Sequence, residues 1–354
     1  MEKSKMVNQN INEEKTSIFS FFKLKKTDRI NSEKPKDVKT WVIHGISEYV
    51  GTILLSLLLA GLSTIIKVSD GHIFRIEEYL IHNIIVGFYA GFIAVGLVLF
   101  IFLRWSCDLN PTVSFFRYLN GSQTGWYVVY KIFIQLLGSI TAGAIIYGVG
   151  KLTNESHVGY FSNLPFDAIT AAKKAFPDFQ GVSNSQSALL SGSTWIFFIE
   201  LVMTAVLLFP IFSPNINGKY RDLFIMFIIS MSVWMGILGG SAAINPFRGL
   251  AQQLPLLVFE DLSNGTEQIK KIVGMFSSEA NFDGAKLYYN SVVSATISLM
   301  LGGILAPVFY LFVQGITQRW INPFIIKVIS YKNYKSEHME KLSKTTPVNK
   351  IEQK

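Results

Sequence analysis

Long apolar runs alternate with short polar segments along the chain. The runs of roughly 20 residues or more lie at residues 42–67, 81–104, 126–149, 193–213, 221–240 and 289–316. Each run is long enough to cross a hydrocarbon core about 30 Å thick. A segment isolated in lipid must satisfy its own backbone hydrogen bonds, so all six are predicted to be helices. The pattern therefore predicts an all-α membrane protein with six transmembrane helices.

Two shorter apolar stretches, residues 105–121 and 241–256, each contain an Asn-Pro pair. They are too short to span a membrane and too apolar for ordinary loops. Asn caps a helix N-terminus well, and Pro costs nothing at the first helical position because its missing N–H has no helical partner there. Each stretch is therefore predicted to begin a short helix, near 110–118 and near 245–254. An Asn-Pro cap on an interfacial helix is the alternative for either stretch alone.

The two halves of the chain repeat one arrangement. Glu48 in the first span and Glu200 in the fourth are each followed, one span later, by an Asn-Pro stretch. Three spans per half predict an inverted-topology repeat, of residues 41–149 and 193–316, whose re-entrant half-helices meet from opposite faces. The amides of Asn110 and Asn245 are then expected near the midplane, free to donate to a passing solute. Each Glu is expected to brace the adjacent half-loop through its backbone N–H groups; snorkelling to the surface is the alternative.

Composition agrees with a membrane protein. Hydrophobic residues make up 50% and charged residues 16% of the chain, where a soluble chain carries about 25% charged residues. The single cysteine, Cys107, excludes an internal disulfide and a cysteine metal site. The spans contain no histidine cluster, nucleophile triad or phosphate-binding glycine loop, so we expect no enzyme activity, metal, cofactor or nucleic-acid partner.

Basic residues gather at particular span ends. The segments 1–40 and 317–354 and the link with Lys219 and Arg221 are rich in Lys and Arg. Basic loops stay in the cytoplasm, and an even number of spans returns the chain to the same side. We therefore expect a plasma-membrane protein with cytoplasmic tails at both termini. The loops 150–192 and 257–288 then lie outside.

Arg248 follows the second Asn by three positions. A cation in the first turn of a helix opposes the helix dipole, which indicates a role other than helix stability. The functional interpretation is a pore-lining donor that repels cations and binds a polar solute. The alternative is a side chain that reaches up to the interface.

With two half-loops, two Asn-Pro motifs and this arginine, residues 42–316 resemble the aquaporin and glycerol-facilitator family, the major intrinsic proteins. The segments Gln135–Gly138 and Gly239–Gly240 also match. The resemblance implies an aquaporin-like fold, a homotetramer with one pore per subunit, and exclusion of protons and cations by the arginine and the half-helix dipoles. It implies two pore motifs, formed by Asn110, Pro111, Thr112, Asn245, Pro246 and Phe247. It also implies a constriction built from Arg248, Ala242, Val233 and one residue among Phe88, Tyr89 and Ala90.

The motifs depart from the family pattern at three positions. Thr112 and Phe247 stand where the family usually has Ala after Asn-Pro. The Phe247 ring either packs outward between helices or narrows the passage. Asp108 stands where the family usually has His, which places a carboxylate beside the pore, and Arg104 is expected to neutralise it.

The small residues Ala242 and Val233 leave room at the constriction and make one of its walls apolar. Such a wall suits the carbon chain of a polyol, so we predict passive conduction of glycerol or related polyols, with water. A water-selective aquaporin is the first alternative. A secondary transporter that couples through Asp108 and a non-conducting relative closed by Phe247 also stay open.

Overall fold

The computed structural model describes residues 17–67, 73–80, 83–153, 161–176, 185–213, 216–260 and 285–345. The chain divides into two compact units, one of residues Leu24–Phe309 and the other of Met1–Lys23 with Tyr310–Lys354. Among the described residues, six helices are long and apolar enough to cross a membrane. The predicted all-α membrane architecture with six spanning helices is confirmed.

The first span is shorter than the hydrophobic run predicted. Helix α1 covers Val38–Leu59, a 3₁₀ turn covers Ala60–Ser63, and strand β1 (Ile65–Lys67) pairs antiparallel with β2 (Ile73–Arg75). The predicted helix over 42–67 is therefore wrong at its end. The reason is a strand-like contact, because the Ile65 N–H donates to the carbonyl of Ser162 at 3.0 Å and draws this segment out of the helix.

The N-terminal end of α1 is set by a local cap. The Asp37 carboxylate accepts a hydrogen bond from the backbone N–H of Thr40 at 2.9 Å, which satisfies one of the orphan donors of the first turn. This bond, with a second from the Thr40 hydroxyl, holds the pKa of Asp37 below its usual value.

The second span is one helix with a wider turn in its middle. It runs through α2 (Asn83–Phe88), a π-helical segment (Tyr89–Val95) and α3 (Gly96–Phe102). Within the π segment, a Cβ on Gly91 would lie 2.1 Å from the backbone oxygen of Met226. Glycine therefore allows close contact with the fifth span, and π segments occur often at functional sites.

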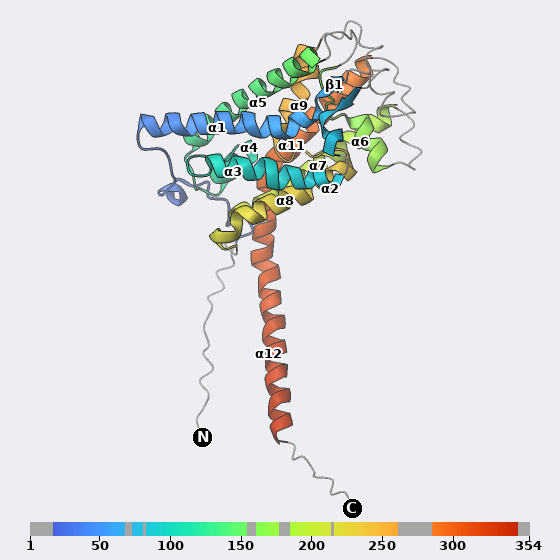
Figure 1. Ribbon diagram of the computed structural model, residues 1–354. Helices are drawn as coiled ribbons and strands as arrows, with labels where there is room; N and C mark the ends of the chain where they lie inside the picture. Colours follow the sequence, from blue (N-terminus) through green and yellow to red (C-terminus); the bar gives the residue numbers. More distant parts are fainter. Residues whose placement is uncertain are drawn as a thin grey trace, which may run out of the picture. The chain divides into compact units, whose positions relative to one another are not determined.

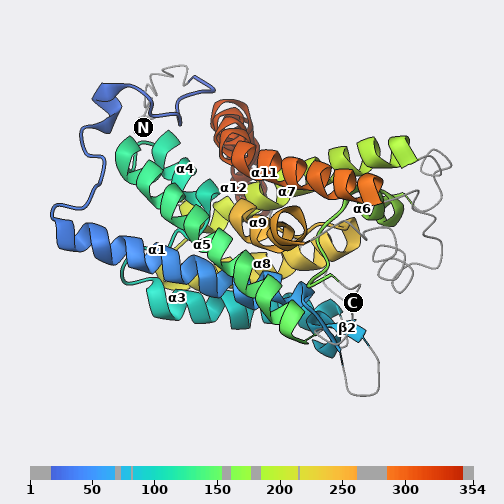
Figure 2. The ribbon, with the colours of Figure 1, turned by 90° about the horizontal axis from the view of Figure 1, so that it is seen from above.

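The remaining spans follow, and Figures 1 and 2 show both half-helices beside the third span. The spans are α5 (Gly125–Thr153), α7 (Ser185–Phe212), α8 (Gly218–Gly239) and α11 (Ala285–Ile316). The half-helices are α4 (Pro111–Leu119) and α9 (Pro246–Leu254), and α9 continues into a π turn at Pro255–Phe259. A short helix, α6 (Ala168–Ala175), lies in the predicted 150–192 loop.

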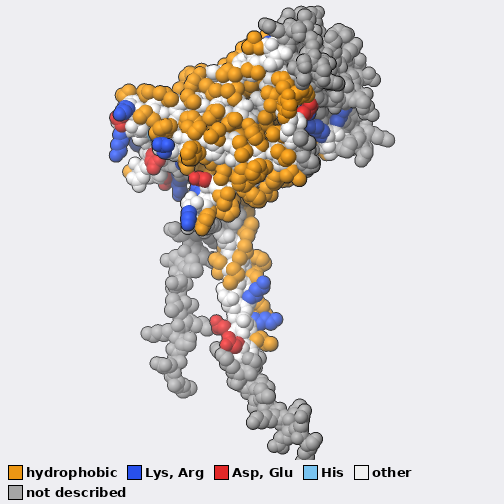
Figure 3. All heavy atoms as spheres, in the orientation of Figure 1, with side chains coloured by type: hydrophobic (Ala, Val, Ile, Leu, Met, Phe, Trp, Pro, Cys, Tyr) orange, Lys and Arg blue, Asp and Glu red, His pale blue; other side chains and the backbone are white. Residues whose placement is uncertain are grey.

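The outside of the Leu24–Phe309 unit is apolar. Figure 3 shows a face on which hydrophobic side chains form a broad band, with charged side chains gathered toward its two edges. Phe100 and Trp126 are each 83% exposed. A soluble protein rarely exposes so large an apolar surface, whereas lipid accommodates it. The chain is thus a multi-pass membrane protein.

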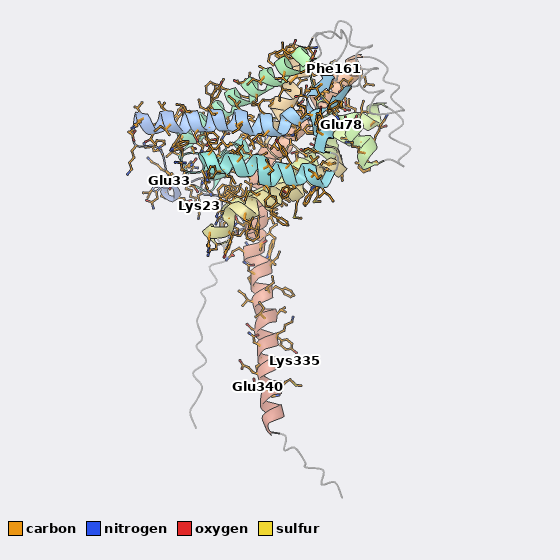
Figure 4. The ribbon with its side chains drawn as sticks, in the orientation of Figure 1. Lys23, Glu33, Glu78, Phe161, Lys335 and Glu340 are labelled. Carbon is orange, nitrogen blue, oxygen red and sulfur yellow. The ribbon has the colours of Figure 1, made fainter. Side chains whose placement is uncertain are left out.

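The segment before α1 binds the end of the first half-helix. It contains a 3₁₀ turn at Lys26–Arg29. The Arg29 guanidinium donates to the carbonyl of Tyr118 and lies 3.9 Å from its ring centroid. The Ser32 hydroxyl donates to the carbonyl of Gly121 at 2.6 Å. Glu33 follows Ser32 in the chain. Figure 4 shows Glu33 and Glu78 at opposite ends of this unit.

The other unit is mostly helical in its described part. The last turns of α11 continue through a π segment (Thr317–Ile321) into α12 (Asn322–Thr345), along which Lys335 and Glu340 are labelled in Figure 4. The Phe19 ring packs on the ring of Phe312 with centroids 6.2 Å apart.

Candidate functional site

Both half-helices begin with the cap that their Asn-Pro pairs predict. The Asn110 side-chain oxygen accepts a hydrogen bond from the Thr112 N–H at 3.0 Å. The Asn245 oxygen accepts from the N–H groups of Phe247 and Arg248 at 3.1 and 3.3 Å. Each proline occupies the first helical position, where no backbone donor is needed.

The two half-helices meet through their capping residues. The Asn110 amide donates to the carbonyl of Ile244 at 3.3 Å, and the Asn245 amide donates to the carbonyl of Leu109 at 2.6 Å. Each asparagine therefore binds the half-loop of the opposite repeat. We expected both amides to be fully free for a solute; instead, one of the two hydrogens on each amide is engaged, and one is left.

The residue before each asparagine has an unusual backbone conformation. Leu109 has φ 48° and Ile244 has φ 58°, and they are the non-glycine residues with positive φ in the described chain. Such a conformation costs about 1–3 kcal/mol for a residue with a bulky side chain. It turns each carbonyl toward the opposite asparagine, so the strain has a direct use at this site.

Two glutamates hold these strained loops with matching hydrogen bonds. Glu48 accepts from the Asp108 and Leu109 N–H groups at 3.0 and 2.8 Å, and from the Ser106 hydroxyl at 2.5 Å. In the second half, Glu200 accepts from the N–H groups of Ala243 and Ile244 and from the Ser241 hydroxyl. The donors stand one, two and four positions before the asparagine in both halves. The side chains do not snorkel, because Glu48 and Glu200 are 0% and 1% exposed.

A cavity of about 610 Å³ contains the meeting point of the two asparagines. Its lining follows α8 from Arg221 to Gly240, about 28 Å at 1.5 Å per residue. That distance is close to the thickness of a hydrocarbon core. The cavity thus follows nearly the whole length of one span, as a transmembrane passage requires.

Most of the residues expected at the constriction line this cavity. Arg248, Ala242, Val233 and Ala90 are among its lining residues, together with Val86. The Arg248 guanidinium donates to the carbonyl of Ala242 at 3.3 Å. Its Nε is buried and has no hydrogen-bond partner among the described residues.

Of the three residues considered in the second span, Ala90 lines the cavity, whereas Phe88 and Tyr89 do not. Phe88 is 51% exposed and stacks on the ring of Phe92 at 4.9 Å. Residues two positions apart project from a helix about 200° apart, so Phe88 and Ala90 cannot both face the passage.

The third positions of both motifs point away from the passage. Thr112 and Phe247 are 0% and 6% exposed, and neither lines the cavity. The Thr112 hydroxyl donates to the carbonyl of Gly303 at 2.9 Å, and the carbonyl of Phe247 accepts from the Ser139 hydroxyl at 2.6 Å. Of the two arrangements considered for Phe247, the structure has the one in which the ring packs between helices.

Asp108 lines the cavity, but its partners differ from the expected one. Its carboxylate pairs with Arg117 of α4, at 2.9 Å from Nε, and with Lys131 of α5. Arg104 instead lies over the ring of Trp105, 5.3 Å from its centroid. The sequence could have indicated a buried partner for Lys131, because a lysine within an apolar span normally pairs with a group inside the protein.

The charges around the cavity balance. Among the described residues, five that line the cavity are basic and five are acidic: Arg75, Arg117, Lys174, Arg221 and Arg248 against Glu77, Glu78, Asp108, Asp167 and Asp222. Near the β2 end, Arg75 pairs with Glu77 and Glu78 at 2.5 and 3.1 Å. A balanced lining attracts neither cations nor anions over its length.

Comparison with known proteins gives one family match. The model of the Major intrinsic protein family matches residues 36–263. Among solved structures, the chain is similar to the X-ray structure of the aquaglyceroporin from Plasmodium falciparum, with 18% sequence identity and a TM-score of 0.47. That similarity covers 77% of this chain and 96% of the other. No curated protein sequence matches this chain significantly.

Proposed function

This chain belongs to the major intrinsic protein family, whose members are channels for small solutes rather than enzymes, and we propose that it passively conducts glycerol or a similar small polyol, with water. The observation that carries the proposal is the combination of polar and apolar groups in the lining that includes Arg248. Val233 and Ala90 contribute apolar side chains to the lining, and the Arg248 guanidinium with the Ala242 backbone contributes polar groups.

A polyol matches such a lining because its hydroxyls and its carbon chain occupy different edges. Hydrogen bonds from Arg248 and from the remaining amide hydrogens of Asn110 and Asn245 replace those to water. The carbon chain then contacts Val233, Ala90 and the other apolar lining residues. Water needs no apolar side, so a lining designed for water alone gains nothing from these contacts.

The balance of charge supports an uncharged solute. An ion entering the cavity loses its hydration, and paired charges already bonded to one another offer it little in return. This balance therefore favours conduction of neutral solutes over conduction of cations or anions.

A secondary transporter is the alternative function, and Asp108 is the carboxylate it needs for coupling. Both of its oxygens are already engaged, Oδ1 by Arg117 and Oδ2 by Ser114 and Lys131. A coupling carboxylate has to release its partners in each cycle. This arrangement therefore favours a channel.

Stopped-flow light scattering on liposomes with the purified protein tests the proposal. We expect swelling under a glycerol gradient and shrinkage under an impermeant osmolyte, both at least about tenfold faster than in empty liposomes, a barrier difference of about 1.4 kcal/mol. Water flux without glycerol flux would establish the water-selective alternative. Glycerol accumulation that follows an imposed proton gradient would establish the transporter.

We also propose a homotetramer in the plasma membrane, with both termini in the cytoplasm. The tetramer follows from family membership and the apolar exterior, and the orientation from the basic residues near the span ends. Mass determination of the purified protein in detergent distinguishes a tetramer from a monomer of 39.7 kDa.

A further inference from the structure

One charged side chain breaks the symmetry of the two half-loops. Asp108 stands two positions before Asn110, and the corresponding residue in the second half is Ala243. Both backbone N–H groups bind a glutamate in the same way, but Ala243 has no polar side chain. Asp108 therefore adds to this part of the passage a carboxylate that the second half-loop lacks.

This carboxylate is closely compensated. Arg117 Nε lies 2.9 Å from its Oδ1, the Ser114 hydroxyl donates to Oδ2 at 2.9 Å, and Lys131 forms an ion pair with Oδ2. The side chains of Asp108 and Lys131 are 4% and 1% exposed, whereas Arg117 is 32% exposed. Asp108 and Arg117 both line the cavity, while Lys131 lies behind them.

The pair lies on the other side of the two asparagines from Arg248. The Arg117 guanidinium is 5.1 Å from the ring centroid of Phe212, the last residue of α7, and so lies near the start of α8. Arg248 bonds to Ala242, which follows the other end of α8. Helix α8 connects these two ends, so the pair and Arg248 lie in opposite directions along the passage.

We propose that Asp108 and Arg117 form a second charge filter on this side of the two asparagines, with Lys131 as a positioning residue, and that their mutual neutralisation keeps ions out. This inference rests on the proposed passive conduction of neutral solutes. Arg248 has no carboxylate bonded to it in the described chain and repels cations directly. The Asp108–Arg117 pair acts differently, because it presents hydrogen-bonding groups without a net charge.

The surrounding charges show why a single substitution upsets the balance. Lys131 also lies 3.7 Å from Glu48, so two acidic and two basic groups form one cluster. Arg221 and Asp222 line the same end, and they add one charge of each sign. Loss of the Arg117 charge leaves the cluster negative, and loss of the Asp108 charge leaves it positive. The two changes therefore have opposite effects on ion selectivity.

The test measures ion leak in planar bilayers under a KCl gradient, with glycerol flux recorded in liposomes from the same preparations. We expect a cation-selective leak in Arg117→Gln and an anion-selective leak in Asp108→Asn, each at least about tenfold above wild type. The double variant Asp108→Asn, Arg117→Gln restores neutrality and is expected to be as ion-tight as wild type. Arg104→Gln is the matched control, because it removes the same charge outside the cavity.

Arg117→Lys keeps the charge, so it is expected to stay ion-tight and shows whether this position tolerates substitution. Leaks of the same selectivity in both single variants, or a double variant as leaky as either one, would overturn the charge filter and indicate a packing defect. Ion-tight single variants that still conduct glycerol would overturn it as well. Absence of glycerol flux in the wild type would instead count against the proposed function, whatever the ion measurements give.

Discussion

Replacing Glu200 by Gln removes one charge from the centre of the second half-loop while its size is kept. In the native protein the carboxylate accepts from the N–H groups of Ala243 and Ile244 at 2.8 and 2.6 Å, and from the Ser241 hydroxyl. An amide has one oxygen to accept with, and its nitrogen faces a backbone donor. At least one of these buried donors therefore loses its partner.

The expected loss follows from these bonds. A hydrogen bond to a charged group contributes about 1.5–3 kcal/mol, and a buried donor left unsatisfied costs about 1–3 kcal/mol. Without these bonds the loop can also leave the strained φ of Ile244. Relief of this strain returns about 1–3 kcal/mol, so the loop is expected to move from its native position. We expect a net destabilisation of about 2–4 kcal/mol, a lower melting temperature by several degrees, and loss of most of the glycerol flux.

Melting in detergent and glycerol flux in liposomes measure the two effects together. Glu337→Gln on α12 is the matched control, since this residue is exposed and its substitution is expected to change neither quantity. An unchanged melting temperature and flux in Glu200→Gln would refute the bracing role of this carboxylate. A lower melting temperature with full flux would show that the half-loop does not depend on it for its conducting geometry.

Other expectations concern single positions. Arg248→Ala is expected to raise proton leak at least about tenfold while glycerol still passes, measured with a pH dye inside liposomes; an unchanged leak would remove Arg248 from the filter. Phe247→Ala is expected to leave glycerol flux within about twofold and to cost about 3–5 kcal/mol of stability, because the ring is buried outside the cavity; a large gain in flux would show that the ring blocks the passage. In a Cys107→Ser background, an impermeant maleimide is expected to label Tyr79→Cys from outside intact cells and Tyr334→Cys only after permeabilisation; the reverse pattern would invert the topology.

The helices and the half-helix caps were predictable because their causes are local. Apolar runs of sufficient length give spans in lipid, and an Asn-Pro pair caps a helix wherever it stands. That the two half-helices meet followed from the repeat of motifs in the two halves. The hydrogen bonds of Asn110 to Ile244 and of Asn245 to Leu109 did not, because both amides were expected to be free for a solute. The strand β1 was missed, because hydrophobicity alone does not tell a buried strand from the last turn of a span.

The surroundings of Asp108 could not be read from neighbouring positions in the sequence. Arg104 stands four residues before Asp108, yet the partners come from α4 and α5. Only the tertiary arrangement brings Lys131 to Asp108. The orientation of the second span was also beyond the sequence, since the π segment shifts the phase of the helix and leaves Phe88 outside and Ala90 inside.

Narrowing the passage at Val233 tests the central claim most directly. Val233 lines the cavity on its apolar side, and a phenylalanine there takes up space that a polyol needs more than water does. Val233→Phe is expected to lower glycerol permeability at least about tenfold relative to wild type and to lower water permeability by less than about threefold in the same liposomes. Glycerol permeability equal to that of the wild type would contradict the account, because the solute would then cross by a route that this residue does not line.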